Sequence, residues 1–489
     1  MNTPKPIFVT SAIPYVNAEP HLGHALELVQ SDALARYQRQ SGHAVHFTSG
    51  TDDNSLKNVR AASRARVTPL ELVARHGAEF RRLADTLHVS HDDFIHTASD
   101  ARHAPAVHAL WQRCCERGDV YKKAYRGLYC VGCESFLRES ELVAGGCATH
   151  SEPLELLDEE NWFFRLTRYA EPILQAILSD RLQILPKERK NEVCQFIRGG
   201  LEDFSISRSR ARAKGWGVAV PGDDTQIVYV WFDALANYLS VLGFPESESF
   251  TRYWQGAGER WHVLGKDILR FHAVYWPAIL LSAGLALPSS LRVHGHITSH
   301  GKKIGKSLGN AVDPFRLVAR YGVDAVRYYL LGHLHTTKDS DFREDLLRTA
   351  YGSELAGKLG NLLQRVSALC ERHSVAIVTT ELDPELLEVA QRTRSAVAQA
   401  VADFALQDAL RAIFELIAAA NRHVDRTAPW QLAHAANDAA TAEERLRARG
   451  ALQRCLSSDV HALTVSAELL APFLPDTAGA IRARLLPKP

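Results

Sequence analysis

Two histidines flank a leucine and a glycine in the stretch 21–24, which reads His-Leu-Gly-His. An apolar, strand-like run over residues 7–10 precedes them and a helical pattern follows, so they stand between a strand and a helix. In an open α/β sheet, phosphates bind at this junction. His21 and His24 could donate hydrogen bonds to phosphate oxygens, and Gly23 would let a nucleotide approach the backbone. Taken alone, the pattern is more typical of solvated histidines, since the chain has 22.

A cationic loop is the second candidate for phosphate chemistry. Residues 301–307 read Gly-Lys-Lys-Ile-Gly-Lys-Ser. Three lysines among two glycines favour a mobile loop whose Lys303 and Lys306 could stabilise negative charge on a phosphate during its transfer. An exposed turn without a role explains the same residues equally well.

Four potential metal ligands follow further along the chain. Cys130 and Cys133 are three positions apart, and Cys147 and His150 repeat that spacing after 13 intervening residues. Such a Cys₃His set predicts a structural Zn²⁺ site, because all four positions are filled and none is left for water. Buried thiols and a surface histidine are the less favoured alternative.

Asp52 follows a second strand-like run, residues 45–49. A carboxylate at the end of that strand could bind a ribose hydroxyl or a substrate ammonium. On spacing alone, a cap for a helix over residues 55–66 is at least as consistent. The next helix has clearer signals, because Thr68, Pro69 and Glu71 fit the N-cap, the first turn and a capping box.

The elements that would position these residues alternate between strand and helix. Helical patterns cover 22–40 and 267–283, and further strands are predicted at 226–230, 261–264 and 291–296. The alternation predicts an α/β fold, a doubly wound, Rossmann-like parallel sheet split by an insertion, and the Ala/Leu-rich end predicts a helix bundle. The expected domains are the first catalytic half (1–118), the insertion (119–215), the second catalytic half (216–300), a loop and linker (301–344) and the bundle (345–489).

The composition is that of an ordinary globular protein. The net charge of +1 gives no global signature of a nucleic-acid binder, so RNA would have to contact local basic patches. One candidate patch is the run Arg208, Arg210, Arg212 and Lys214. The sequence contains neither an apparent membrane span nor a signal peptide, so we expect a cytoplasmic protein. We also expect it to be a monomer.

Together these pieces resemble one family. The stretch 21–24 resembles the HIGH signature of class I aminoacyl-tRNA synthetases, and residues 303–307 resemble their KMSKS loop. Within the class, the chain is similar to the methionyl-tRNA synthetases along nearly its whole length, notably at residues 12–17, 229–234 and 262–272. The zinc-knuckle insertion resembles one bacterial version, and is too short for the editing domain of the leucine, isoleucine and valine enzymes.

The resemblance implies a methionine pocket, with Asp52 holding the substrate ammonium. A thioether offers no strong hydrogen bond, so selectivity must come from shape and from sulfur–aromatic contacts. The implied lining residues are Ile13, Tyr15, Trp231, Ala234, Tyr238, Ile268, His272 and Trp276. Ile268, His272 and Trp276 are spaced to share one helical face, which by itself would more often be core.

The resemblance also implies a two-step reaction. Methionine would attack the α-phosphorus of ATP, bound with Mg²⁺, and the adenylate would then react with the terminal adenosine of tRNA. His21, His24, Lys303 and Lys306 would be catalytic and, with Gly23, would bind ATP. Asn361, Arg365 and Trp430 match residues that read a CAU anticodon, where tryptophan could stack an unpaired base.

Two segments depart from the family pattern. Residues 52–55 read Asp-Asp-Asn-Ser where the family usually has Asp-Glu-His-Gly, and Ile304-Gly305 replaces Met-Ser in the lysine loop. Reduced or altered activity is one consequence of such changes. The alternatives are a paralogue that activates methionine or an analogue for another acceptor, and a non-catalytic tRNA-binding protein. The intact histidines and lysines disfavour the non-catalytic alternative.

Overall fold

The computed structural model describes residues 5–132, 134–137, 142–148, 153–256, 258–299, 301–304 and 312–485. The chain forms two compact units. The first comprises Met1–His296 with Ile304–Pro314, and the second comprises Ile297–Lys303 with Phe315–Pro489. The second unit thus takes in most of the segment that the sequence assigns to a loop and linker.

A parallel sheet forms the centre of the first unit and confirms the predicted α/β fold. Among the described residues it has six strands, in the order β3-β2-β1-β14-β15-β9. Every neighbouring pair is parallel. The strands are β1 (Pro6–Ser11), β2 (Ala44–Thr51), β3 (Asp93–His96), β14 (Glu259–Gly265), β15 (Ser290–His294) and β9 (Gln183–Leu185).

The order of these strands locates the functional edge of the sheet. From β1 the chain proceeds outward through β2 and β3, whereas β14 and β15 continue on the opposite side of β1. The strand order therefore reverses between β1 and β14, and in open α/β sheets ligands bind at the carboxyl ends beside such a switch point. Those ends are Ser11 and Gly265.

Helix α1 (Leu22–Gln40) connects β1 to β2 and has the bounds predicted from sequence. Its apolar side packs against β1, β2 and β14. A separate hydrophobic cluster joins Phe8 of β1 and Leu264 of β14 to the helices α4 and α10. Helices of the first unit are α2 (Leu56–Ala65), α3 (Pro69–Thr86), α4 (His103–Glu116), α5 (Ala170–Leu178), α6 (Lys187–Arg198), α7 (Val230–Leu235), α8 (Asn237–Ser240), α9 (Glu248–Phe250) and α10 (Trp276–Ser282).

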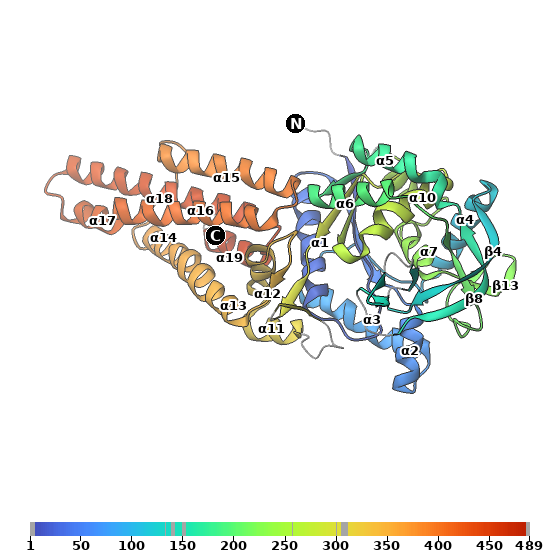
Figure 1. Ribbon diagram of the computed structural model, residues 1–489. Coiled ribbons are helices and arrows are strands. Elements are labelled where there is room, and N and C mark those ends of the chain that lie inside the picture. Colours follow the sequence, from blue (N-terminus) through green and yellow to red (C-terminus); the bar gives the residue numbers. More distant parts are fainter. Residues whose placement is uncertain are drawn as a thin grey trace. The chain divides into compact units, whose positions relative to one another are not determined.

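Smaller antiparallel sheets are formed by the insertion and the residues just after it, with strands labelled β4, β8 and β13 in Figure 1. In the largest, the long pair β4 (Val120–Cys130) and β8 (Glu155–Phe164) is flanked by β5 (Ser135–Leu137) and β10 (Phe204–Ser205). The others comprise β11 (Ser207–Ser209), β12 (Ala219–Val220) and β13 (Asp223–Val228), and the hairpin of β6 (Leu142–Val143) and β7 (Gly146–Cys147).

Two local expectations are corrected by the structure, and one strand of the parallel sheet was not predicted. The predicted strand 226–230 ends at Val228 and belongs to an antiparallel sheet, because β13 pairs with β11 and β12. From the insertion, β9 joins the edge of the parallel sheet beside β15. The predicted helix 267–283 is irregular, with a 3₁₀ turn at Lys266–Ile268 and a π-helical turn at Phe271–Tyr275 before α10.

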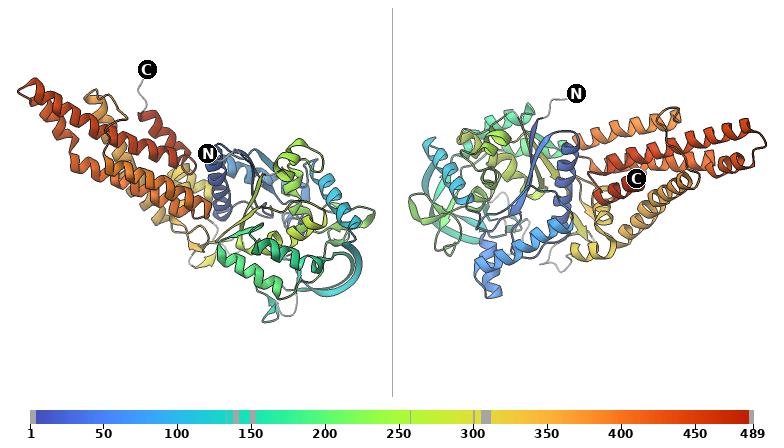
Figure 2. Two further views of the ribbon diagram at one scale, coloured as in Figure 1. Left: turned by 90° about the horizontal axis from the view of Figure 1, so that it is seen from above. Right: turned by 180° about the vertical axis from the view of Figure 1, so that it is seen from behind.

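The second unit is largely helical, as predicted. Its long helices α15 (Pro384–Ala402), α16 (Leu406–Thr427) and α18 (Ala442–Leu470) lie side by side, orange to red in each view (Figures 1 and 2). The remaining elements are α11 (Pro314–Tyr321), α12 (Val323–Tyr328), α13 (Glu344–Ala350), α14 (Asn361–Arg372), α17 (Pro429–Asp438), α19 (Pro475–Leu485) and the short strands β16 (Ile297–Ser299), β17 (Lys302–Lys303) and β18 (Ser340–Asp341). Within the described chain, no helix is both long and apolar enough to span a bilayer.

Candidate active site

The His21 and His24 side chains cap the N-terminus of α1. His21 Nδ1 accepts a hydrogen bond from Gly23 N at 3.1 Å, and His24 Nδ1 accepts one from His21 N at 3.1 Å. The two rings stack with centroids 3.9 Å apart. Because each Nδ1 is an acceptor, the ring proton of each neutral imidazole is on Nε2. Two N–H donors are thereby fixed at a helix N-terminus, where phosphate is favoured.

Gly23 has a local reason that sequence reasoning missed. A Cβ atom at this position would lie 2.9 Å from His21 Cε1 and 3.1 Å from His21 Nδ1. Any larger residue would therefore displace the capping ring. Gly23 is therefore needed to make room for the His21 ring, independently of any need for a nucleotide to approach the backbone.

The lysine loop is only partly described. Lys303 ends β17, which pairs with β16, and Ile304 is buried. Lys306 lies outside the described residues. The role of both lysines therefore remains a prediction from sequence.

Asp52 lies at the carboxyl end of β2, where its backbone forms a parallel bridge with Tyr15. Only 2% of the residue is exposed. Burial raises the pKa of its carboxyl group well above the ordinary value, and the charges of Asp233, Asp53 and Glu134 raise it further. Among the described residues, no lysine or arginine forms an ion pair with Asp52, so a bound cation would stabilise its charged form.

The alternative role of Asp52 as a helix cap is wrong. Helix α2 is capped by Ser55, whose side chain accepts a hydrogen bond from Asn58 N at 3.2 Å. Asp52 instead accepts a bond from Asn54 N at 3.3 Å. The serine that departs from the family pattern therefore starts a helix, and Asp52 is left for another role.

The other two departing residues also have structural roles. The side-chain amide of Asn54 donates to Asp233 Oδ2 at 2.8 Å, while Asp233 Oδ1 lies 2.9 Å from His103 Nε2. Asp53 N donates to Thr97, and Asp53 Oδ2 accepts from Ala98 N at 3.2 Å. Burial raises the pKa of Asp53 to about 7. The segment 53–55 is thus integrated into a hydrogen-bonded network beside Asp52.

His272 is held as a neutral imidazole. Its Nδ1 lies 3.0 Å from the Ile268 carbonyl, which can only accept, so Nδ1 carries the proton. Its Nε2 consequently accepts from the Tyr238 hydroxyl at 2.8 Å. Burial lowers the pKa of His272 to about 4, which agrees with this assignment. The anomalous histidine of the predicted apolar face is therefore fully bonded.

Aromatic rings surround His272. Trp231 lies edge-on to both Tyr15 and His272, each at 6.3 Å between centroids, and Tyr238 lies 6.1 Å from Trp276. The Tyr15 hydroxyl and the indole nitrogens of Trp231 and Trp276 are buried without a hydrogen-bond partner in the described chain. This arrangement brings Tyr15, Trp231, Tyr238, His272 and Trp276 together as the sequence predicts.

The remaining predicted pocket residues are Ile13, Ile268 and Ala234. Ile13 and Ile268 are partly buried against the hydrophobic core. Ala234 is buried in α7, and its carbonyl accepts from the Asn237 side chain. No measured contact places Ala234 against the rings, so its pocket role stays a prediction.

Sequence reasoning missed two residues of the cluster. Phe271 stacks on Trp231 with centroids 3.7 Å apart and ring planes 4° apart. His262 stacks on Tyr238 at 4.1 Å and bonds to Thr10 at 2.7 Å. Phe271 is adjacent to His272 and does not share its face in a regular α-helix, so the π-helical turn removed the signal. His262 lies in a strand, where an isolated histidine gives none.

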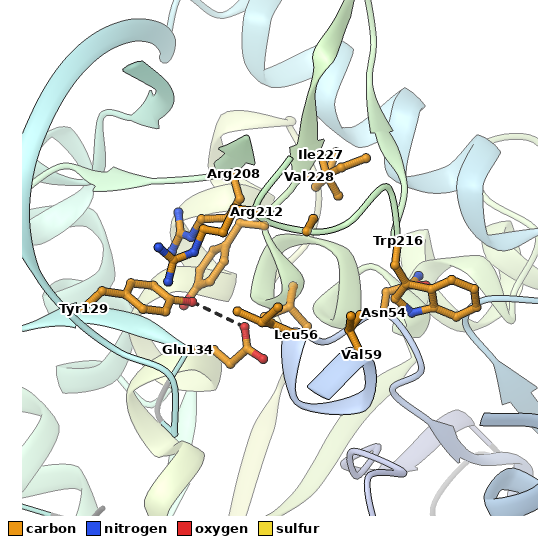
Figure 3. A pocket seen from close by; sticks show the side chains of 13 residues that line it. Asn54, Leu56, Val59, Tyr129, Glu134, Arg208, Arg212, Trp216, Ile227 and Val228 are labelled. Atoms are coloured by element: carbon orange, nitrogen blue, oxygen red, sulfur yellow. Dashed lines mark hydrogen bonds between the residues drawn. The ribbon is translucent and has the colours of Figure 1, made fainter. Parts of the chain in front are cut away.

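A small pocket, partly open to solvent, is lined by Asn54, Leu56 and Val59, which follow Asp52 in the chain (Figure 3). Tyr129, Arg208 and Arg212 line one end and Trp216 lies at the other. The Trp216 indole donates to the Asp53 carbonyl at 2.8 Å, which ties this pocket to the segment after Asp52.

Arg208 and Arg212 do not contribute to the basic RNA-binding patch that the sequence predicts. Arg208 is only 8% exposed and lies over the Tyr229 ring at 4.3 Å. Arg212 lies over the Tyr129 ring at 4.3 Å and donates to Glu155 Oε2 at 2.9 Å. Both guanidinium groups are thus used to pack aromatic side chains.

Two of the four proposed zinc ligands lie at strand ends of the described chain. Cys130 ends β4 and is buried, and Cys147 ends β7 and is partly exposed. Cys133 and His150 lie outside the described residues. The two described thiols have the ligand chemistry that zinc requires, at the ends of hairpins as knuckles need.

The predicted anticodon residues lie in the second unit. Asn361 begins α14 and is exposed, whereas Arg365 donates to Asp425 at 3.0 Å and to Asn421 at 2.8 Å. Trp430 follows Pro429 at the start of α17 and is 40% exposed. Trp430 is therefore a surface residue and not part of the hydrophobic core.

A strand-order switch point beside an imidazole-capped helix, in a chain whose second unit is helical, is the arrangement that the resemblance to class I aminoacyl-tRNA synthetases predicts. The family model described as "tRNA synthetases class I (M)" matches residues 7–153 and 140–367. The chain belongs to this family, that of the methionine enzymes.

Methionine–tRNA ligases of other organisms are similar to this chain over most of its length. The methionine–tRNA ligase of Brucella suis is 40% identical over 435 residues, covering 87% of this chain and 83% of the relative. That of Mycobacterium leprae is 38% identical over 488 residues, covering 97% and 88%. The structure of Mycobacterium tuberculosis methionyl-tRNA synthetase with methionyl-adenylate aligns with a TM-score of 0.90, 38% identity, and coverage of 98% and 93%.

Proposed function

We propose that this enzyme activates methionine with ATP to methionyl-adenylate and transfers the methionyl group to tRNA with a CAU anticodon. One observation carries the choice of amino acid: a buried, uncompensated carboxylate, Asp52, adjoins an aromatic pocket through Tyr15. The carboxylate suits an ammonium group, and the pocket suits an unbranched, polarisable side chain.

The pocket selects the substrate side chain by its shape and by the hydrogen-bond partners that it lacks. His272 Nδ1–H donates a hydrogen bond to the Ile268 carbonyl, and its Nε2 accepts one from the Tyr238 hydroxyl. The ring therefore presents no unpaired polar atom to a thioether. Sulfur packs favourably against aromatic edges. A charged side chain would lose its hydration among these uncharged rings, which disfavours it.

The first chemical step is an in-line displacement. The methionine carboxylate oxygen attacks the α-phosphorus, and pyrophosphate leaves with the electron pair of the broken P–O bond. Magnesium bound with ATP supplies positive charge to the phosphates. The Nε2–H donors of His21 and His24 hold phosphate oxygens at the N-terminus of α1, and Lys303 and Lys306 neutralise charge as pyrophosphate departs.

The second step transfers the amino acid to RNA. A ribose hydroxyl of the terminal adenosine attacks the adenylate carbonyl, and AMP leaves. The enzyme contributes mainly by positioning the reactants. We assign reading of the anticodon to Asn361, Arg365 and Trp430, of which Trp430 offers an exposed ring for base stacking.

The proposal includes one structural Zn²⁺ held by Cys130, Cys133, Cys147 and His150. When bound, zinc would tie the two hairpins together. We further propose that the enzyme acts as a monomer and, since tRNA charging supplies translation, that it works in the cytosol. Metal content and light scattering test the first two statements.

The decisive test is ATP–pyrophosphate exchange with each amino acid in turn, followed by charging of tRNA with a CAU anticodon. We expect exchange with methionine above all others, and charging of that tRNA. Exchange with a different amino acid would refute the methionine assignment. Exchange without charging would instead favour the paralogue with another acceptor.

A further inference from the structure

We propose that the helical unit contains a second, previously unassigned transition-metal site, formed by His423, Cys455 and Asp459 and taking Zn²⁺. Each of the three residues offers one ligand atom, and these atoms lie within 4.8 Å of one another. All three residues are buried. The site is separate from the cysteine hairpins of the insertion and does not depend on the proposed function.

The ligands come from two adjacent helices. His423 lies in the last turns of α16, while Cys455 and Asp459 are four residues apart on α18 and so share one face. His423 Nδ1 lies 2.7 Å from Asp459 Oδ1, and Cys455 Sγ lies 3.9 Å from Asp459 Oδ2. Imidazole, thiolate and carboxylate are the ligand set that zinc prefers, and bundle cores commonly hold metals this way.

A second carboxylate is placed to orient the histidine. Asp383, the N-cap residue of α15, has its Oδ2 3.7 Å from His423 Nε2. Arg426 Nη2 in turn donates to Asp383 Oδ2 at 3.3 Å. With the metal on Nδ1, the Nε2 proton would face Asp383. A metal-bound histidine usually donates its other N–H to a carboxylate, which fixes the ring.

The local charge also favours a cation. Two carboxylates, Asp383 and Asp459, face one imidazole, and only Asp383 has an arginine partner. The cluster lies beside the C-terminal turn of α16, where the helix dipole stabilises positive charge. Thr427 Oγ1 donates to the His423 carbonyl at 2.7 Å and lies 2.9 Å from Cys455 Sγ, so the Cys455 thiol donates to Thr427. Metal binding would replace the short His423–Asp459 hydrogen bond, and the Cys455 thiol proton would be released to solvent as sulfur binds the metal.

The test is zinc per full-length chain, measured by mass spectrometry after chelator treatment and reloading. We expect Cys455→Ser and Asp459→Asn to bind one equivalent fewer than the wild type. Cys370→Ser, at another cysteine of the same bundle, should bind as much as the wild type. The difference is independent of zinc bound elsewhere. Equal content in all four proteins would overturn the site.

A gentler variant guards against loss of folding. Asp383→Asn keeps an N-cap residue of equal quality for α15. We expect it to melt close to the wild type but to bind the second zinc about 10- to 100-fold more weakly, because the orienting carboxylate is gone. Cobalt should report the sulfur ligand, with thiolate-to-cobalt absorption that falls in Cys455→Ser but not in Cys370→Ser. Unchanged affinity in Asp383→Asn with unchanged cobalt absorption in Cys455→Ser would refute the proposal.

Discussion

At the scale of single residues, burial has opposite consequences for the two groups that define the amino-acid site. It raises the pKa of the Asp52 carboxyl and lowers that of the His272 imidazole, because in both cases the charged form loses its hydration. Asp52 lacks a cationic partner in the described chain, whereas His272 has two hydrogen bonds that suit its neutral form. One group is thus prepared for a charged ligand and the other for an apolar one.

Asp52→Asn separates the function of this carboxylate from stability. We expect methionine-dependent exchange to fall at least about 100-fold, because a buried charge-assisted contact to the ammonium is lost. The melting temperature should stay the same or rise, since a buried charge among acidic neighbours is removed. Exchange kinetics and thermal unfolding of the same preparation measure both. An active variant would show that the ammonium is bound elsewhere.

His272 gives a stability change with pH. Its pKa is about 4 in the folded protein and 6.5 ordinarily, so the unfolded chain binds a proton that the fold does not. The free energy of unfolding should therefore fall as the pH drops from about 6.5 to about 4, by on the order of 3 kcal/mol. Denaturant titrations across this range measure it. His272→Gln, whose amide oxygen can still accept from Tyr238, should have a shallower pH dependence.

At the scale of elements, the N-terminus of α1 combines a side-chain cap with the proposed phosphate site. His21 satisfies a backbone N–H through Nδ1, so the ring proton of the neutral imidazole is on Nε2. The irregular helix after β14 likewise places side chains of the site through its local backbone geometry. Its π-helical turn, Phe271–Tyr275, brings both Phe271 and His272 to the aromatic cluster, which a regular helix would not.

His21→Asn tests whether the cap and the chemistry are separable. Asparagine is a good N-cap residue, so stability should be close to that of the wild type, whereas His21→Ala should lose about 1 kcal/mol. Both variants lack the Nε2 donor, and we expect both to lose at least about 10-fold in exchange rate. If His21→Asn retained full exchange, the imidazole would serve only as a cap.

At the scale of the whole molecule, amino-acid activation and anticodon reading are assigned to different compact units. The aromatic pocket and Asp52 belong to the first unit, and Trp430 belongs to the second. A change at Trp430 should therefore affect RNA recognition and leave adenylate formation intact.

Trp430→Ala should reduce tRNA charging by about 10-fold or more, because stacking of one base contributes about 1–3 kcal/mol. Methionine-dependent exchange should be unchanged. Leu446→Ala changes an exposed leucine of α18. It is the matched control and should alter neither reaction. Equal loss of exchange and charging in Trp430→Ala would indicate a structural role for the tryptophan.

The sequence alone determined the features set by local patterns. Helix α1 begins and ends where its apolar spacing and flanking residues predict, and the Thr68 capping box forms as expected. The motif order was enough to indicate the family, because short motifs keep their spacing along the chain. Thr68, Pro69 and Glu71 act through neighbours within one helical turn, so no distant contact could override them.

The tertiary structure decided what depends on distant partners. Pairing with β15 made residues 183–185 an edge strand, and pairing with β11 and β12 took β13 out of the parallel sheet. Aromatic rings from separate segments surround Arg208, which buries a charge that sequence places on the surface. His423, Cys455 and Asp459 meet only when α16 packs on α18. Such contacts join residues far apart in the chain, and local propensity carries no record of them.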